Sequence, residues 1–289
     1  MKHTEYRGDR VKREAVLDYY IRNGEIFSIQ SQMLADITGE NTIYEVIRVI
    51  DGVALYFEEH MERMRKSAEI LGYAINKSDG EVFREIEKLI KMNNNPDLNI
   101  KLLCSNLHQE NQDFLLYFMK SHYPEQAVCR RGIHTILFES ERENPNAKVV
   151  NNNLRQRVQE AMETARAFEA LLVNNEHYIT EGSRSNIFFV KEDHLITAPP
   201  GDVLLGVTRM RIMEVCKKLQ IQVKEELLHE SQLTEIDAAF MTGTSVNVLP
   251  IHSIDERIYH STENLVLQTV QKGYLADMEA YIKNRKARD

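Results

Sequence analysis

Glycine is scarce in this sequence. Only 12 of the 289 residues are glycine, and the phosphate-binding patterns GxGxxG and GxxxxGK[ST] do not occur. The average share of glycine in proteins is about 7%. Ordinary NAD and ATP sites build their phosphate cradles from such loops, so the sequence disfavours both kinds of site.

Metal-binding and disulfide patterns are missing as well. The three cysteines, Cys104, Cys129 and Cys216, are an odd number at wide spacings, and no HExxH, HxH or close Cys/His pair occurs. We expect reduced thiols and no metal site.

Long apolar runs and an excess of positive charge are also absent. No run approaches the ~18 residues that span a bilayer, and the first residues contain no apolar signal core. The formal net charge of −8 disfavours nucleic acid and anionic membranes as partners. The expected location is the cytoplasm.

Two turn dipeptides mark hairpins in the first part of the chain. Asn23-Gly24 and Asp51-Gly52 tolerate the positive φ values of a type I′ turn, so we expect strands on both sides of each. Apolar residues at helical spacing predict amphipathic helices at residues 58–71, ending at Gly72, and 79–92. The other expected elements are strands at residues 100–105, 114–119, 133–138, 170–173, 238–242 and 246–251, a hairpin pairing 178–180 with 187–190, and helices at 154–168, 208–219 and from about 263.

Strands and helices are mixed along the chain and do not alternate as βαβ units, so the predicted fold class is α+β. Residues 1–14 are charged and lack periodicity, which is typical of a flexible arm. We expect a small domain at residues 15–120, a linker at 121–131 and a large domain at 132–289.

Three polar clusters could carry chemistry. Residues 180–186 (TEGSRSN) form a sharp turn between apolar strands, and residues 206–209 (GVTR) start a helix at which Thr208 is a plausible N-cap. Residues 241–245 (MTGTS) follow an apolar strand and could hold an oxyanion. Taken alone, the first cluster is more typical of an ordinary turn and the second of a plain helix cap, and the third equally makes an ordinary turn.

The order of these motifs resembles the fold-type IV pyridoxal-phosphate enzymes, the class IV aminotransferases. The motifs are FEEHMERMRKSAEILG, the lysine in NPNAKVVNN, ITEGSRSNIFFV, LLGVTR and FMTGTS, and the resemblance covers residues 15–253. It implies a smaller N-terminal α/β sandwich, a larger C-terminal mixed β-barrel-like domain with helices, pyridoxal 5′-phosphate in the cleft between them, and a homodimer.

The resemblance also implies roles for six residues. Lys148 matches the lysine that binds the cofactor as a Schiff base, and its neighbours Val149 and Val150 could lower its pKa by desolvation. Glu181 matches the carboxylate that faces the pyridine nitrogen. The phosphate is expected to be bound by Arg63, reaching from the helix face opposite the apolar stripe, and by Val207, Thr208 and Thr244.

Substrate specificity is less defined by the motifs. Tyr44, Arg48 and Ser245 are substrate-pocket candidates, with packing on the strand surface as the alternative for the first two. Family members that act on D-amino acids have an Arg-x-His pair, for which the nearest match here is Lys120-Ser121-His122. Branched-chain members usually have a tyrosine where this chain has Asn153.

The leading hypothesis is an aminotransferase that moves an amino group between an amino acid and a 2-oxo acid through Lys148. One alternative is β-elimination of the aminodeoxychorismate lyase type on the same cofactor. The other is a non-catalytic binding protein that has kept the fold. Gly182-Ser183 after the glutamate is typical of transaminases and favours transamination over lysis.

Overall fold

The structure, a computed structural model, describes residues 14–30, 42–121, 123–140, 146–149 and 152–287. The chain divides into two compact units. Unit 1 comprises Met1–His122, Ala147–Val150 and Tyr281–Asp289, and unit 2 comprises Tyr123–Asn146 and Asn151–Ala280. The chain therefore passes between the units more than once. The expected arm lies outside the described residues except for Glu14.

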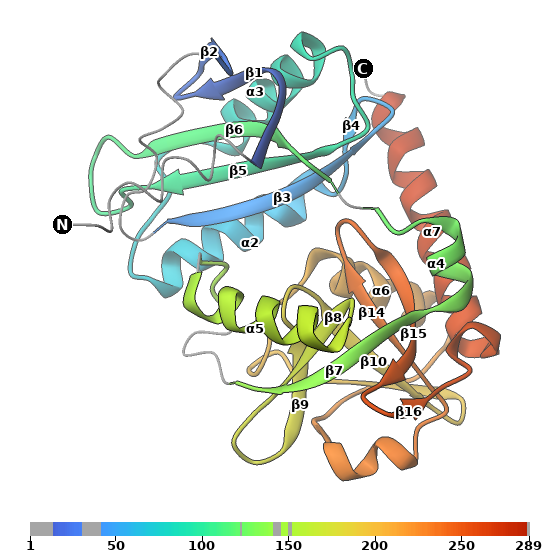
Figure 1. Cartoon of the computed structure of the whole chain (residues 1–289). Helices are drawn as coiled ribbons and strands as arrows, with labels where there is room; N and C mark the ends of the chain where they lie inside the picture. The colour runs from blue at the N-terminus through green and yellow to red at the C-terminus, as the bar shows by residue number, and fades with distance from the viewer. Residues whose placement is uncertain (1–13, 31–41, 122, 141–145, 150–151, 288–289) are drawn as a thin grey trace. The chain divides into compact units, whose positions relative to one another are not determined.

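Unit 1 is built on a six-stranded sheet in the order β2-β1-β6-β5-β3-β4, in which all neighbouring strands are antiparallel (Figure 1). Central β5 is buried along its whole length, whereas β3 alternates between buried and half-buried residues. One face of β3 is therefore turned to the core. The strands are β1 (Ala15–Arg22), β2 (Glu25–Ser28), β3 (Ile43–Ile50), β4 (Val53–Ala54), β5 (Asn99–Ser105) and β6 (Asp113–Met119).

Both predicted hairpins of unit 1 are confirmed. Asn23 and Gly24 join β1 to β2 with positive φ angles of 50° and 89°, and Asp51 and Gly52 join β3 to β4 with 52° and 78°. These are the left-handed conformations that a type I′ turn requires at both central residues. The second strand of the second hairpin has only two residues, Val53 and Ala54, and the helix that follows begins at Phe57.

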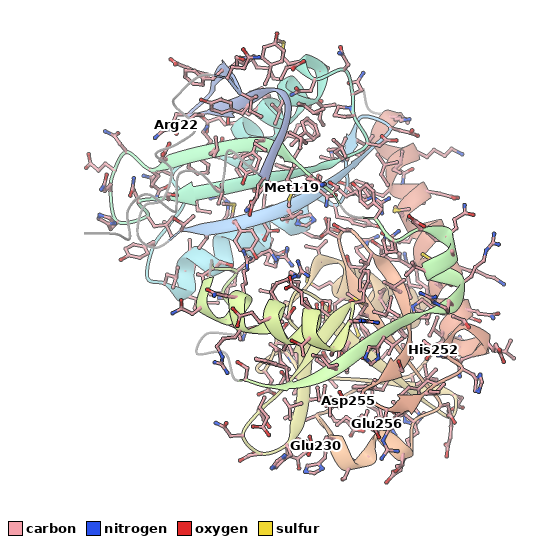
Figure 2. All side chains as sticks on the ribbon, viewed as in Figure 1. Arg22, Met119, Glu230, His252, Asp255 and Glu256 are labelled. Atoms are coloured by element: carbon pink, nitrogen blue, oxygen red, sulfur yellow. The ribbon has the colours of Figure 1, made fainter. Side chains whose placement is uncertain are left out.

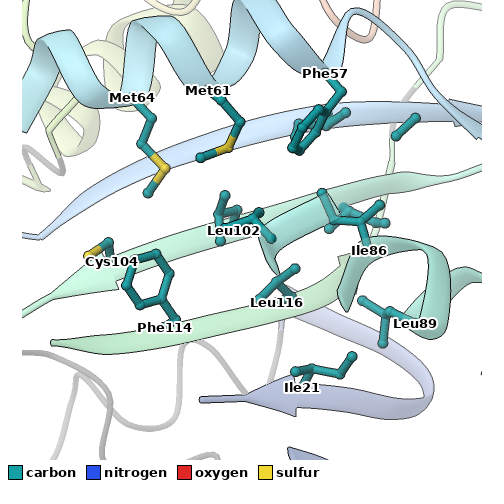
Figure 3. Packing of buried hydrophobic residues seen from close by; sticks show 14 of the residues in the cluster. Ile21, Phe57, Met61, Met64, Ile86, Leu89, Leu102, Cys104, Phe114 and Leu116 are labelled. Carbon is teal, nitrogen blue, oxygen red and sulfur yellow. The ribbon is translucent and has the colours of Figure 1, made fainter. Parts of the chain in front are cut away.

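Helices α2 (Phe57–Ile70) and α3 (Asp79–Met92) agree with the predicted positions. Ser78 caps α3 in a capping box with Glu81, and Gly72 follows α2 with a φ of 81°. Both helices pack on the sheet. Figure 3 shows the side chains between them: Phe57, Met61 and Met64 of α2, Ile86 and Leu89 of α3, Leu102 and Cys104 of β5, Phe114 and Leu116 of β6, and Ile21 of β1.

Unit 2 contains a ten-stranded sheet in the order β12-β11-β10-β14-β15-β7-β8-β9-β13, with β16 paired to β15. Parallel pairs (β7 with β8 and β15, β11 with β12) are mixed with antiparallel ones, and together with unit 1 this confirms the α+β class. The strands are β7 (Ile133–Glu139), β8 (Glu169–Val173), β9 (Tyr178–Gly182), β10 (Asn186–Lys191), β11 (His194–Thr197), β12 (Val223–Glu225), β13 (Leu228–His229), β14 (Ala238–Gly243), β15 (Asn247–Ile254) and β16 (Arg257–Ile258). The helices are α4 (Gln126–Arg131), α5 (Asn152–Ala165), α6 (Val207–Lys218) and α7 (Leu265–Lys286), the last of which ends in unit 1.

The hairpin expected between residues 178–180 and 187–190 was wrong. β9 pairs with β8 and β13, whereas β10 pairs with β11 and β14. The intervening turn is held by one hydrogen bond within it, from Gly182 N to Ser185 O, and by one to β8, from Ser183 N to Ala170 O. The turn therefore ends one ladder and starts another instead of closing a hairpin.

The expected linker at residues 121–131 contains α4. Gly132 follows this helix with a φ of 80°, and a Cβ at this position would stand 3.0 Å from the backbone nitrogen of His252 on β15. Figure 2 labels His252. Glycine is thus required twice over at this position, by conformation and by space. In the described part of the chain, no helix is long and apolar enough to cross a membrane. The cytoplasmic location stays a prediction.

The cysteines differ in accessibility, and all three are free thiols. Burial raises the pKa of Cys104 and of Cys216 to about 12, whereas Cys129 is half-buried. The thiolate is the reactive form, so we expect iodoacetamide at neutral pH to modify Cys129 alone in the native protein. Peptide mass mapping after native and denatured labelling measures this. Native labelling of Cys104 or Cys216 at the rate of Cys129 would contradict the burial described.

Candidate functional site

Lys148 is fixed to unit 1 by its backbone. Its carbonyl accepts from Tyr44 N (3.2 Å), and its neighbour Val149 forms an antiparallel bridge with Ile43 at the start of β3. Its own N–H donates to Ser67 Oγ on α2 (3.1 Å), and that hydroxyl in turn donates to the carbonyl of Arg63 (3.0 Å). One chain of hydrogen bonds therefore joins the expected Schiff-base lysine to the helix that carries the expected phosphate arginine.

The Lys148 side chain is half-buried and lies against Tyr44, with Nζ 4.8 Å from the ring centroid. A second amine, Nζ of buried Lys101, is 5.6 Å from the same ring and is paired with Glu14. An ammonium over an aromatic face gains cation–π attraction, so Tyr44 holds both side chains in place. Of the two valines expected to desolvate Lys148, Val149 packs against the hydrophobic core, and Val150 lies outside the described residues.

Arg63 is paired with a buried carboxylate that the sequence analysis did not identify. Its Nε donates to Glu45 Oε1 (2.8 Å) and its Nη2 to Glu45 Oε2 (2.5 Å), and Glu45 has no exposed surface. The expectation that Arg63 lies opposite the apolar stripe of its helix was wrong. Arg63 is buried beside that stripe, because the carboxylate of Glu45 on β3 provides a partner there.

His60 completes this cluster. Its Nδ1 is 2.7 Å from Glu45 Oε2, and the ring is buried. Burial lowers the pKa of His60, and the charges of Arg63 and Lys148 lower it further against the opposing effect of Glu45. His60 is therefore neutral at pH 7, with the Nδ1 proton donated to the carboxylate.

The pKa of Glu45 is also shifted by this cluster. Burial alone would raise its pKa, but the charge of Arg63 and the hydrogen bonds from His60 and Arg63 lower the pKa from 4.5 to about 2. A carboxyl with a lowered pKa stabilises the fold fully above pH 4.5, and this contribution is lost as the pH falls towards about 2.

We therefore expect the stability advantage of the wild type over Glu45→Gln to be constant down to about pH 4.5 and then to shrink by a few kcal/mol towards about pH 2. Urea unfolding followed by circular dichroism between about pH 5.5 and about pH 3 covers the informative range. An advantage that does not change over this range would show that folding does not lower the pKa of Glu45.

Glu181 ends β9 in unit 2 and is 3% exposed. Its Oε2 accepts from Leu204 N (3.2 Å) and lies 3.5 Å from Asn186 Nδ2. The same amide nitrogen donates to Leu204 O (2.8 Å). Asn186 thus links the carboxylate to the segment that leads into α6.

Gly206 is the N-cap of α6 and lies close to the same asparagine. A Cβ on Gly206 would stand 2.2 Å from Asn186 Oδ1, a distance at which one of the two must move. Because Gly206 has no side chain, no side chain of the N-cap residue covers the first N–H groups of the helix. Thr208 is the second helical residue, so its expected role as N-cap was wrong.

Thr244 and Ser245 lie in the turn between β14 and β15, and both are half-buried. Two contacts place this turn near the others. Asn186 is paired with Thr242 across the ladder, and a Cβ on Gly243 would be 3.9 Å from Arg184 O. The three polar clusters of the sequence are therefore gathered at one end of the unit 2 sheet.

A second buried carboxylate, Glu169 of β8, supports the turn after Glu181. It accepts from Ser183 Oγ (2.5 Å), Ser185 Oγ (3.0 Å) and Ala170 N (2.9 Å). A Cβ on Gly182 would be 2.0 Å from Ser185 Oγ, so this position needs glycine. The two serines of this turn thus hold it in shape.

Sequence reasoning missed three of these residues, Glu45, His60 and Ser67, although two signals were available. The spacing of His60, Arg63 and Ser67 is helical and places them on one side of α2, beside the apolar residues. Glu45 stands out as a charged residue at an inward position of an alternating strand. Arg48, the remaining substrate-pocket candidate, is half-buried on β3 at a position in phase with Tyr44, and His122 of the expected carboxylate trap lies outside the described residues.

The residues present fit pyridoxal 5′-phosphate chemically. Unit 1 supplies a half-buried amine against an aromatic ring and a buried guanidinium. Unit 2 supplies the buried carboxylate of Glu181 and the start of α6, whose N-cap is a glycine. It also supplies two hydroxyls, that of Thr208 in the first turn of α6 and that of Thr244 in the turn between β14 and β15. An amine for the aldehyde, a carboxylate for the pyridine nitrogen and donors for a phosphate are the groups such a cofactor needs.

Comparison with known proteins gives a consistent result. The model of the family "Amino-transferase class IV" matches residues 42–254. The probable branched-chain-amino-acid aminotransferase of Rickettsia typhi is 30% identical over 260 residues, which are 85% of this chain and 90% of that protein. The D-alanine aminotransferase of Bacillus licheniformis is 26% identical over 224 residues, covering 74% and 78%.

Solved structures show the same fold. The branched-chain amino acid aminotransferase of Escherichia coli aligns with a TM-score of 0.79 at 24% identity, covering 91% of this chain and 95% of that one. The branched-chain aminotransferase from Thermoproteus uzoniensis, solved with norvaline, aligns with a TM-score of 0.77 at 20% identity, covering 93% and 98%. A further branched-chain enzyme of this fold was solved with pyridoxamine 5′-phosphate, and it aligns with a TM-score of 0.79 at 22% identity.

Proposed function

The chain belongs to the class IV aminotransferase family and is an aminotransferase, and we propose that it binds pyridoxal 5′-phosphate through Lys148 and the residues around it. Members of this family are pyridoxal-phosphate enzymes, and their substrates are amino acids and 2-oxo acids. The observation that carries the proposal is the hydrogen-bond chain from the Lys148 N–H through Ser67 to the Arg63 carbonyl. These two hydrogen bonds connect the backbone of the proposed aldehyde-binding lysine to that of the proposed phosphate-binding arginine within unit 1, which supports the proposal.

Each proposed residue has a distinct task. Pyridoxal phosphate, when bound, supplies an aldehyde and an electron-accepting ring. Lys148 Nζ would hold the aldehyde, and as a free amine it would move a proton between the substrate Cα and the cofactor carbon C4′. Glu181 keeps the proton on the pyridine nitrogen. Arg63, the backbone N–H groups of Val207 and Thr208, and the hydroxyls of Thr208 and Thr244 bind the phosphate.

Tyr44, Arg48 and Ser245 remain the proposed substrate-pocket residues. Tyr44 has the strongest support, since its ring contacts Lys148 directly. Named relatives act on branched-chain amino acids or on D-alanine, so the proposal covers amino acids of either hand. A panel of amino donors in both enantiomers, with 2-oxoglutarate and pyruvate as acceptors, identifies the preferred pair.

The test of the cofactor proposal is direct. Purified protein is expected to be yellow, and borohydride reduction is expected to add the mass of the reduced cofactor to the peptide that contains Lys148. A colourless protein that takes up no added pyridoxal phosphate would overturn the proposal. Incubation with one amino acid and no acceptor separates transamination, which stops after one half-reaction, from lysis, which continues.

We also propose a homodimer, as the family resemblance implies. Ile258 and Leu265 of unit 2 are 65% and 76% exposed, and such apolar side chains are candidates for burial in an interface. Sedimentation equilibrium of the holoenzyme measures the assembly state, and a mass of one chain at micromolar concentration would contradict the proposal.

A further inference from the structure

The pairing of Arg63 with Glu45 bears on how a phosphate could be bound. Two of the three guanidinium nitrogens, Nε and Nη2, donate to the two carboxylate oxygens in a forked arrangement. Arg63 therefore cannot turn its Nε–Nη2 edge to a phosphate without releasing Glu45. The pairing with Glu45 thus fixes the plane and the direction of the Arg63 guanidinium, although an arginine side chain is flexible when it has no such partner.

The charges in the cluster also matter. With Glu45 ionised and His60 neutral, the positive charge of Arg63 is already balanced inside unit 1. The cluster as a whole is not a strong attractor of anions, so a function of Glu45 in phosphate binding has to come from geometry. A donor that is already oriented loses less conformational entropy when a ligand arrives.

Stability of the fold does not by itself explain the pair. Glu45 points to the face of β3 that packs on α2, where Ile43 and Ile47 are hydrophobic. Buried ion pairs are in general no better for stability than apolar residues of similar size, because both charges lose their hydration. A buried carboxylate at this position therefore calls for a further role.

We propose that Glu45 is a positioning residue for the cofactor phosphate, which fixes the guanidinium of Arg63 in its binding orientation while His60 fixes the carboxylate. This inference rests on the proposed function. The role is exerted through Arg63, and Glu45 itself touches no reacting atom. Glu45 and His60 would therefore contribute to phosphate binding without contacting the phosphate, from buried positions in unit 1.

Affinities for two ligands that differ only in the phosphate test this role. The full-length protein, freed of cofactor, is titrated with pyridoxal 5′-phosphate and with pyridoxal, and absorbance reports binding. Loss of a hydrogen bond to a charged group corresponds to about a tenfold change or more. Glu45→Gln is therefore expected to raise the Kd for pyridoxal 5′-phosphate about tenfold or more and to leave the Kd for pyridoxal within about twofold.

Arg22 and Asp113 provide a matched control in the same sheet. They form the same forked pair, with Nε to Oδ1 at 2.9 Å and Nη2 to Oδ2 at 2.8 Å, and Asp113 is also buried. Asp113→Asn is expected to leave the ratio of the two Kd values unchanged. A second comparison uses Arg63→Gln: if Glu45 acts through Arg63, adding Glu45→Gln to that variant changes the ratio no further.

Two results would overturn the inference. Equal weakening of both ligands by Glu45→Gln would show a purely structural role, and tighter binding of pyridoxal 5′-phosphate would show that Glu45 competes with the phosphate. If Glu45→Gln does not fold, Glu45→Asp keeps the charge with a shorter reach and is judged by the same ratio. A wild-type protein that binds neither ligand would refute the proposed function instead.

Discussion

Replacing Lys148 by alanine is expected to lower transamination at least about 10⁴-fold, since the variant lacks both the group that binds the aldehyde and the group that moves the proton. The fold is expected to be retained. The hydrogen bonds that fix this residue use its backbone N–H and carbonyl, which alanine keeps. Steady-state assay with the preferred amino donor measures the activity, and circular dichroism measures the fold.

Lys101 offers the control for this variant. Its amine lies against the same ring, so the activity of Lys101→Met shows the effect of removing a lysine next to Tyr44 other than Lys148. Borohydride is expected to attach the cofactor to this control and to the wild type but not to Lys148→Ala. Attachment of cofactor to Lys148→Ala with wild-type activity would remove Lys148 from the mechanism.

Glu181→Gln is expected to lower activity on the order of 10²- to 10³-fold, the usual cost of removing one electrostatic stabiliser from an active site. The carboxylate is nearly fully buried, and its neighbours Leu204 N and Asn186 Nδ2 are donors that a glutamine oxygen can also satisfy. A lower activity of Glu181→Gln would therefore result from the lost negative charge and not from a change in side-chain shape. A shifted absorption band of the bound cofactor is expected as well, because the pyridine nitrogen loses its anionic partner.

Glu169→Gln separates the charge of Glu181 from the shape of the turn. Glu169 is another buried carboxylate of unit 2, and it receives the hydroxyls of Ser183 and Ser185. The substitution is expected to leave the cofactor band at its wild-type position. Equal spectral shifts in both variants would mean that the Glu181 result comes from a disturbed turn.

Local sequence signals were sufficient for much of unit 1. Asn-Gly and Asp-Gly turns, an amphipathic period and the glycine after the first helix are determined by residues close together in the chain, and they predicted two hairpins and two helices. The α+β class followed from the same elements. The pairing of β9 and β10 was mispredicted because sheet order depends on distant strands, and residues 183–185 resemble a hairpin turn.

In the candidate site, too, local motifs were predictable and contacts between distant residues were not. Lys148, Arg63 and Glu181 were identified by motif resemblance, which indicates the chemical role of a residue but not its contacts. The partners of Arg63 could not be assigned, since Glu45 is 18 positions away in sequence and meets it only when α2 packs on β3. Gly206 and Asn186 are 20 positions apart, and only the folded chain shows that the absence of a side chain at one makes room for the other.

The segment Ala147–Val150 belongs to unit 1, although the chain on both sides of it belongs to unit 2. The two units are therefore not two consecutive stretches of the chain. A single recombination crossover could not exchange one whole unit between relatives. A chimaera that took residues 1–122 from one relative would combine that relative's Tyr44 and Ser67 with another's lysine segment. Inheritance of the active lysine with its supports requires two separate pieces of sequence, residues 1–122 and the segment Ala147–Val150, to be transferred together, which favours divergence by point substitution over the shuffling of lobes.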